Sequence, residues 1–129
     1  MKSNANLLML VQALNANIGE GKTKAQQKLM KIGQRIQPIL DEFNEKKEEL
    51  RLDNASVDNA GNIILNEKGE YNFSKEGVKQ LNAQLKELLM QEISFEPIKV
   101  INPEGLEHYL FLEGWVDGVT FKKSDEIEL

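Results

Sequence analysis

The fold is decided by residues 22 to 52, which read KTKAQQKLMKIGQRIQPILDEFNEKKEELRL. Apolar side chains recur in this stretch at steps of three and four residues, which return to the same side of an α-helix. The apolar stripe that they form consists of Ala25, Leu29, Ile32, Ile36, Ile39, Phe43 and Leu50. The pattern predicts one long helix with one side buried. This helix organises the rest of the chain.

A second stripe on the same helix is basic and lies beside the apolar one. This basic stripe consists of Lys24, Lys28, Lys31 and Arg35. Residues 20 to 37 contain five basic residues and one acidic residue, so their local balance is +4. Two interpretations stay open, because such a stripe is either a site for phosphate groups or an acidic protein surface, or the solvated face of an amphipathic helix.

Pro38 lies inside the predicted helix. Proline removes one backbone hydrogen bond and clashes with the carbonyl four residues earlier, at a cost of about 3 kcal/mol if nothing compensates. The apolar rhythm continues beyond it through Ile39, Leu40 and Phe43. We therefore expect a kink in one helix and not a boundary between two.

The segments on either side of the long helix predict an α+β domain that is mostly helical. A short helix from Asn4 to about Asn15 is followed by glycines 19 and 21, so it is expected to pair with the long helix as a helical hairpin. Turn residues at 59 to 62 and 67 to 69 predict a small β-hairpin between Asp53 and Phe73. Ser74 is a helix cap for residues 75 to 91.

The C-terminal third is predicted to be less regular. Residues 93 to 100 favour an extended segment that Pro97 interrupts, and Asn102-Pro103 is typical of a helix start. Residues 119 to 121 favour a last short strand, followed by a polar, frayed tail from Lys122 to Leu129. We expect one domain over 1–129, with a helical hairpin in 1–52, a β-hairpin, helix and strand in 53–101, and a short helix, Trp-containing turn and tail in 102–129. No internal repeat is apparent.

The amino-acid composition excludes several classes of chemistry. The chain has 129 residues, a net charge of −5 and no cysteine, so disulfides, thiolate metal sites and cysteine nucleophiles are excluded. The acidic balance gives no general attraction to nucleic acid or anionic lipid. Neither a spanning segment nor a secretory signal is predicted.

Side chains for catalysis or metal binding do not form a recognisable set. His108 is the only histidine, and none of the five serines lies in a nucleophile-elbow pattern. The acidic residues between 41 and 49 alternate with Lys46 and Lys47, which favours a solvated face with ion pairs over a carboxylate pair for catalysis. We predict no enzymatic activity, no cofactor and no metal.

Aromatic residues near the C-terminus form the second candidate binding surface, which consists of Tyr109, Phe111 and Trp115. Tyrosine and tryptophan are common anchors of interfaces, yet in a small domain they also complete the core. Both interpretations stay open at the level of the sequence.

Several stretches resemble a group of small phage and prophage proteins of uncharacterised function. They are NANLL at 4–8, QALN at 12–15, IQPILDEF at 36–43, the Asn/Gly-rich hairpin and the helix from Phe73 to Leu89. The similarity covers about Met1 to Val100 and consists of the order of elements, with no catalytic motif. It implies a phage accessory or virion-associated protein, located in the host cytoplasm or the virion.

These observations give three hypotheses for the function. The first is a non-enzymatic binding or assembly protein with a phage or host protein partner, and with a homo-oligomer covering part of the long helix. The second is a counter-defence protein that inhibits a host immune complex or sequesters a nucleotide on the basic stripe. The third is weak nucleic-acid binding. No membrane association is expected.

Overall fold

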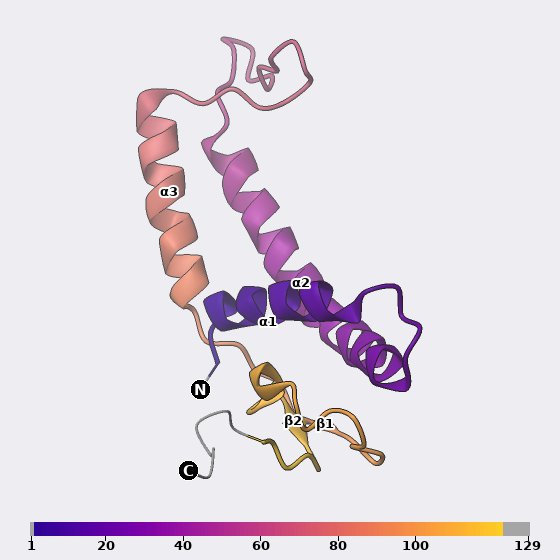
Figure 1. The fold of residues 1–129 in the computed structure, drawn as a ribbon. Helices are drawn as coiled ribbons and strands as arrows, with labels where there is room; N and C mark the ends of the chain where they lie inside the picture. The colour runs from indigo at the N-terminus through magenta and orange to yellow at the C-terminus, as the bar shows by residue number, and fades with distance from the viewer. Residues whose placement is uncertain (1, 123–129) are drawn as a thin grey trace, which may run out of the picture.

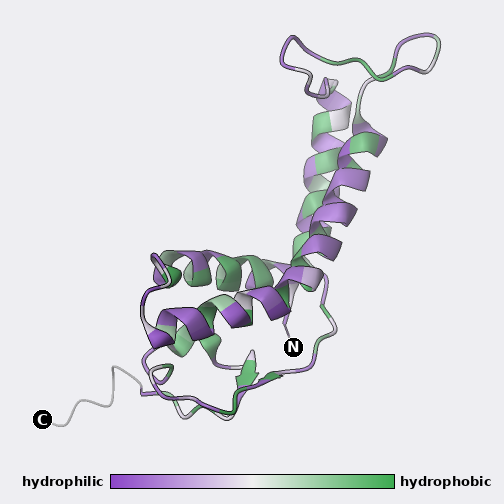
Figure 2. Ribbon diagram, turned by 90° about the vertical axis from the view of Figure 1, so that its right-hand side faces the viewer, coloured by the Kyte–Doolittle hydropathy of each residue, from purple (hydrophilic) through white to green (hydrophobic). Residues whose placement is uncertain are grey.

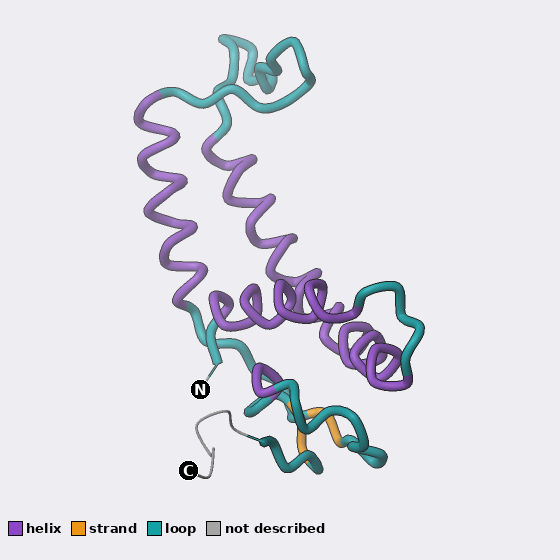
Figure 3. The backbone as a smooth tube through the Cα atoms, in the orientation of Figure 1, coloured by secondary structure: helices purple, strands orange, loops and turns teal. Residues whose placement is uncertain are grey.

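A computed structural model describes residues 2–122 and shows three helices and one small sheet (Figures 1 and 3). The helices are α1 (Asn4–Ile18), α2 (Lys24–Asn54) and α3 (Lys75–Met90), followed by a 3-10 turn at Leu110–Leu112. Strands β1 (Ile98–Lys99) and β2 (Val116–Asp117) pair in parallel. This architecture confirms the predicted α+β, mostly helical fold.

Side-chain caps set where the first two helices begin. The Ser3 hydroxyl accepts a hydrogen bond from the backbone N–H of Asn6, and the side-chain oxygen of Asn6 accepts one from the backbone N–H of Ser3. Thr23 and Gln26 repeat this capping box at the start of α2. Each box satisfies two backbone groups that a helix N-terminus otherwise leaves without a partner.

Helix α2 continues through Pro38 and connects two parts of the molecule. Figure 2 shows that it changes direction between a body, where its first half packs with α1, and a stalk, where its second half runs beside α3. The predicted single helix is therefore confirmed. Because α2, which has 31 residues, is bent, its first half packs on α1 and its second half packs on α3.

The core lies in the body, between α1, the first half of α2 and the C-terminal segment. Most of the predicted apolar stripe of α2 contributes to the interior, and Phe43 is buried further along. The buried cluster of the body consists of Leu7, Leu10, Leu14, Leu29, Ile32, Ile36, Leu106, Leu112, Trp115 and Val116. The stalk buries fewer side chains, with Leu81 and Leu88 from α3.

Two tight turns form the tip of the stalk, in the segment between α2 and α3 (Figure 1). The Asp58 carboxylate accepts hydrogen bonds from the N–H groups of Ala60 and Asn62, and the Asn66 side chain accepts the equivalent pair from Lys68 and Glu70. The two turns are thus equivalent and eight residues apart. This internal repeat was not predicted from the sequence.

Backbone hydrogen bonds at the tip close a ring of three residues. Ser56 donates to Asn72, Asn72 donates to Ile64, and Ile64 donates to Ser56, at 2.8 to 3.1 Å. The predicted hairpin is present as the isolated bridges Val57–Ile63 and Leu65–Tyr71, without longer strands. These three residues are eight positions apart in the chain, which is also the spacing of the two turns, and the hydrogen bonds bring them side by side.

The C-terminal segment departs from prediction at two points. The helix expected from Asn102 is wrong, because residues 104–108 form turns and Gly105 has a φ of +91°, which is incompatible with an α-helix. The strand expected at 119–121 is also wrong, since β2 lies earlier, at Val116–Asp117. Residues 123–129 of the predicted tail lie outside the described residues.

Candidate binding groove

The basic stripe of α2 borders a groove on the surface of the body. Lys28, Lys31 and Arg35 line one wall of a hollow of about 390 Å³. Lys24 is exposed and belongs to the same helix but does not line the hollow. The structure therefore brings three of the four predicted basic residues to one site.

The opposite wall comes from the segment that contains β1. It includes Lys99, which adds a fourth positive side chain to the hollow, and the highly exposed Ile101. Between the two walls lie apolar side chains, contributed by Ile32, Ile98, Val100 and Leu106. The groove thus combines an apolar floor with a cationic rim.

One wall of the groove is tied to the other by direct contacts. The Lys28 ammonium donates a hydrogen bond of 2.6 Å to the backbone carbonyl of Glu104. A Cβ at Gly105 would lie 3.2 Å from the Cβ of Ala25, so the turn approaches α2 closely. Glycine at 105 permits both this approach and the positive φ.

A second hollow continues the groove along α2. It has a volume of about 400 Å³ and lies between α2 and residues 94–99. Arg35, Ile98 and Lys99 line both hollows. The two hollows therefore form one elongated groove between α2 and residues 94–102, which we call the cationic groove.

The four cations of this groove have no acidic partner in the described part of the chain. No carboxylate of residues 2–122 lies within 4.0 Å of the charged groups of Lys28, Lys31, Arg35 or Lys99. On the stalk, by contrast, Lys46 pairs with Glu42 at 3.5 Å and Arg51 with Glu48 at 3.7 Å. The cationic groove therefore contains four cations without an ion-pair partner among the described residues, and Glu96 is the one acidic residue that lines it.

The predicted aromatic surface is not continuous. Trp115 is 3% exposed, and its ring lies 4.8 Å from that of Phe95, with the Lys2 ammonium 5.3 Å from the indole. Tyr109 and Phe111 are half-buried, with ring centroids 5.9 Å apart. Trp115 is therefore part of the core, as one of the two interpretations expected, and does not join Tyr109 and Phe111 at the surface.

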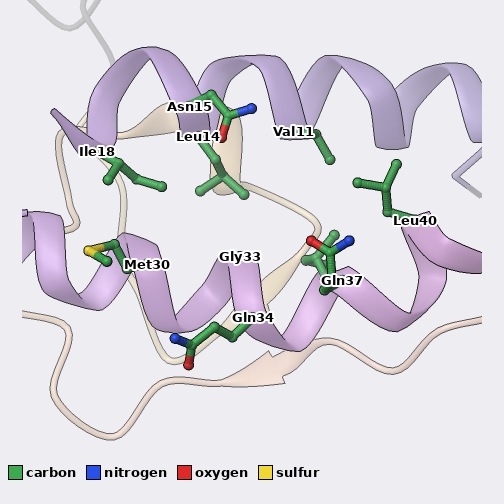
Figure 4. Close-up of a pocket in the computed structure, with 10 residues that line it drawn as sticks. Val11, Leu14, Asn15, Ile18, Met30, Gly33, Gln34, Gln37 and Leu40 are labelled. Atoms are coloured by element: carbon green, nitrogen blue, oxygen red, sulfur yellow. The ribbon is translucent and has the colours of Figure 1, made fainter.

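A separate crevice of about 300 Å³ lies between α1 and α2 (Figure 4). Its lining residues are aliphatic side chains, Met30, Gly33 and the amides Asn15, Gln34 and Gln37. None of its lining residues is charged. The crevice therefore offers aliphatic and amide groups, and no charged group, to a ligand.

The single histidine, His108, has one acidic side chain within 4.0 Å in the described part of the chain. His108 is exposed and its Nε2 lies 3.6 Å from a Glu107 carboxylate oxygen. Hydrogen bonds from the backbone of Glu107 and of Gly105 hold the pKa of that carboxyl below its ordinary value. Among the described residues, no group of three or more histidine, aspartate or glutamate side chains is placed to hold a metal ion.

Two features of the surface were not predicted from the sequence. Lys99 is an isolated lysine in a β-prone segment, and only the tertiary fold places it opposite the basic stripe. The tip exposes the aliphatic residues Val57, Ile63, Ile64 and Leu65. Their exposure carried no signal in the sequence, because a short apolar run also fits a buried strand.

Comparisons with family models, with curated proteins and with solved structures found no match to this chain. Within residues 2–122, none of the helices combines the length and the apolar character needed to cross a bilayer.

Proposed function

We propose that this chain is a non-enzymatic binding protein and that its cationic groove holds an acidic segment of a protein partner. One observation carries the proposal: four positive side chains from two separate segments surround an apolar floor without an acidic partner among residues 2–122. Charge on a rim attracts and orients a partner, and a desolvated apolar floor supplies affinity.

The phage setting is part of the proposal and is supported by the resemblance to phage and prophage proteins. In that setting the partner is a protein of the phage particle, of its assembly or of the host. Proteomic detection of the chain in purified particles would favour the virion. Detection only in infected cells would favour an accessory or counter-defence role.

A nucleotide is the second candidate ligand, and it is favoured by one observation. A hollow of about 390 Å³ with Lys28, Lys31 and Arg35 on one wall has the size and charge of a small-molecule phosphate site. A cyclic dinucleotide that binds there would raise the melting temperature of the full chain, because it prefers the native state.

The proposal is tested with an acetylated, amidated peptide that alternates glutamate and valine, labelled with a fluorophore and titrated with the full chain. We expect saturable binding that weakens with salt, because the contacts on the rim are ionic. The Arg35→Glu variant should bind about tenfold more weakly, a loss of about 1.4 kcal/mol.

The matched control is Lys79→Glu, which makes the same charge change on the exposed side of α3, outside both hollows of the groove. It should leave binding within about twofold, since screening limits the reach of a distant surface charge. A lysine–valine peptide should not bind. Equal losses for both variants would contradict the proposed site.

A further inference from the structure

Strand β1 has one edge that no described residue pairs with, since the sheet contains only β1 and β2. The Ile98 N–H donates to the Trp115 carbonyl at 3.0 Å. The Val100 N–H donates to the Asp117 carbonyl at 2.9 Å. In a parallel ladder every second residue bonds to a given neighbour. The N–H and C=O of Lys99 therefore point away from β2.

This unpaired edge borders the cationic groove. Lys99 lines both of its hollows, whereas neither Val116 nor Asp117 of β2 lines either one. Helix α2 forms the other wall with Lys31 and Arg35. A groove between a free sheet edge and a helix is a geometry in which proteins bind extended peptides by adding a strand.

The chemistry of the floor favours a peptide over a nucleotide. The hollow beside residues 98–102 has no aromatic side chain among its lining residues, so it offers no ring for a base to stack on. The adjoining hollow includes one aromatic residue, Phe95, whose ring packs against Trp115. Its apolar part is aliphatic, with Ile32, Ile98 and Leu106. An aliphatic side chain of a peptide matches this floor.

We propose that the partner segment binds as a third strand on the free edge of β1, with acidic and aliphatic side chains in alternation. The proposal rests on the function proposed above and adds the partner's conformation to it. Backbone bonds to the Lys99 N–H and C=O hold the segment. Because side chains of a strand alternate between two sides, aliphatic residues meet the floor while acidic residues lie near Lys28, Lys31 and Arg35.

The test compares two forms of the glutamate–valine peptide, one N-methylated at every valine and one at every glutamate, in binding to the full chain. Backbone N–H groups of an added strand point alternately toward β1 and away from it. One methylated form should therefore bind about tenfold more weakly, and the other should stay within about threefold of the parent peptide. Equal affinities for the two forms would overturn strand addition.

Variants of the protein provide a second readout. Lys99→Pro removes the outward N–H but no hydrogen bond of the fold, and an edge strand tolerates proline. Lys99→Ala removes the charge and keeps the N–H. We expect Lys99→Pro to lose about tenfold more affinity than Lys99→Ala, with helical circular dichroism unchanged in both. Equal affinities of the two variants would contradict the proposal.

The two proposals fail in distinguishable ways. If Arg35→Glu weakens binding and the two methylated peptides bind alike, the groove holds an acidic partner but not as a strand. If Arg35→Glu has no effect on binding of the parent peptide, the proposed function itself is wrong.

Discussion

The Asn4 side chain donates a hydrogen bond of 2.8 Å to the backbone carbonyl of Leu88, which joins the start of α1 to the last turn of α3. Asn4 is the only polar side chain among the buried residues described, and it is 4% exposed. The backbone N–H of Asn4 also donates to the Gln91 carbonyl at 3.0 Å. This residue therefore fixes the stalk to the body.

Replacing Asn4 with alanine should lower the free energy of unfolding by about 1 to 2 kcal/mol, because it removes a buried hydrogen bond to Leu88. Urea unfolding followed by circular dichroism measures the change. The control is Asn82→Ala on the exposed side of α3, which should shift stability by less than about 0.5 kcal/mol. A similar loss in both variants would show that the buried bond is not responsible.

The Asn4→Asp variant should make stability depend on pH. An ionised carboxylate beside the Leu88 carbonyl is buried and cannot donate, whereas the protonated acid can. The pKa of the new carboxyl should therefore be higher in the folded than in the unfolded protein, so stability should fall as pH rises through the interval between these two values. Urea unfolding at pH 4 and pH 7 tests the sign, and a greater loss at pH 4 would contradict it.

Gly33 and Gly77 provide a matched pair of glycine substitutions within helices. A Cβ at Gly33 meets nothing within 4 Å, so Gly33→Ala should stabilise the fold by about 0.5 to 1 kcal/mol. A Cβ at Gly77 would lie 2.8 Å from the backbone oxygen of Asn54, so Gly77→Ala should destabilise it by about 1 to 3 kcal/mol. Thermal unfolding should move the two melting temperatures in opposite directions.

Trp115 is expected to be a major contributor to the stability of the body. Trp115→Ala should cost about 3 to 5 kcal/mol because it leaves a cavity beside Phe95. Leu110→Ala, at an exposed residue of the same segment, should cost less than about 1 kcal/mol. Chemical unfolding followed by circular dichroism compares them, and equal costs would place Trp115 at the surface after all.

Asp58 should titrate below the ordinary range of an aspartate. Hydrogen bonds from the backbone, first that of Asn62 and then that of Ala60, lower the pKa of its carboxyl. A lowered folded-state pKa gives a stabilising contribution that is present above the unfolded value of about 4 and is lost as pH falls through the folded value. NMR titration of the carboxyl carbon measures it.

The Asp58→Asn variant is the control for this titration. Its amide oxygen can accept the same two bonds, as Asn66 does in the equivalent turn. The backbone N–H groups at the tip should therefore stay protected from hydrogen exchange in this variant. The loss of stability at acidic pH should disappear, because the carboxyl group is gone. If the variant lost as much stability in acid as the parent protein does, a group other than Asp58 would be responsible for that loss.

The sequence predicted the elements whose signals are local. Helix α2 follows from its 3.6-residue period, and Ser74 caps α3 by accepting a bond from Gly77 at 3.0 Å. The Asn102-Pro103 signal failed because Gly105 takes a positive φ to let the turn approach Ala25, which is a demand of packing and not of the local sequence.

The candidate site was predictable in part, for the same reason. One helix carries Lys28, Lys31 and Arg35, so their spacing reveals them. Lys99 joins them only because residues 98–102 fold back on α2. The edge of β1 that carries Lys99 is free because β1 pairs with β2 on its other side. Pairings between distant segments leave little trace in a single sequence.

The second half of α2 acts as a rigid spacer. The 16 residues that follow Pro38 in the helix extend for about 24 Å, at 1.5 Å for each residue. A fluorophore or affinity handle attached at Asn59, in an exposed turn, would therefore sit well clear of the groove. The molecule thus offers an attachment point for immobilisation that leaves the cationic groove open to solution.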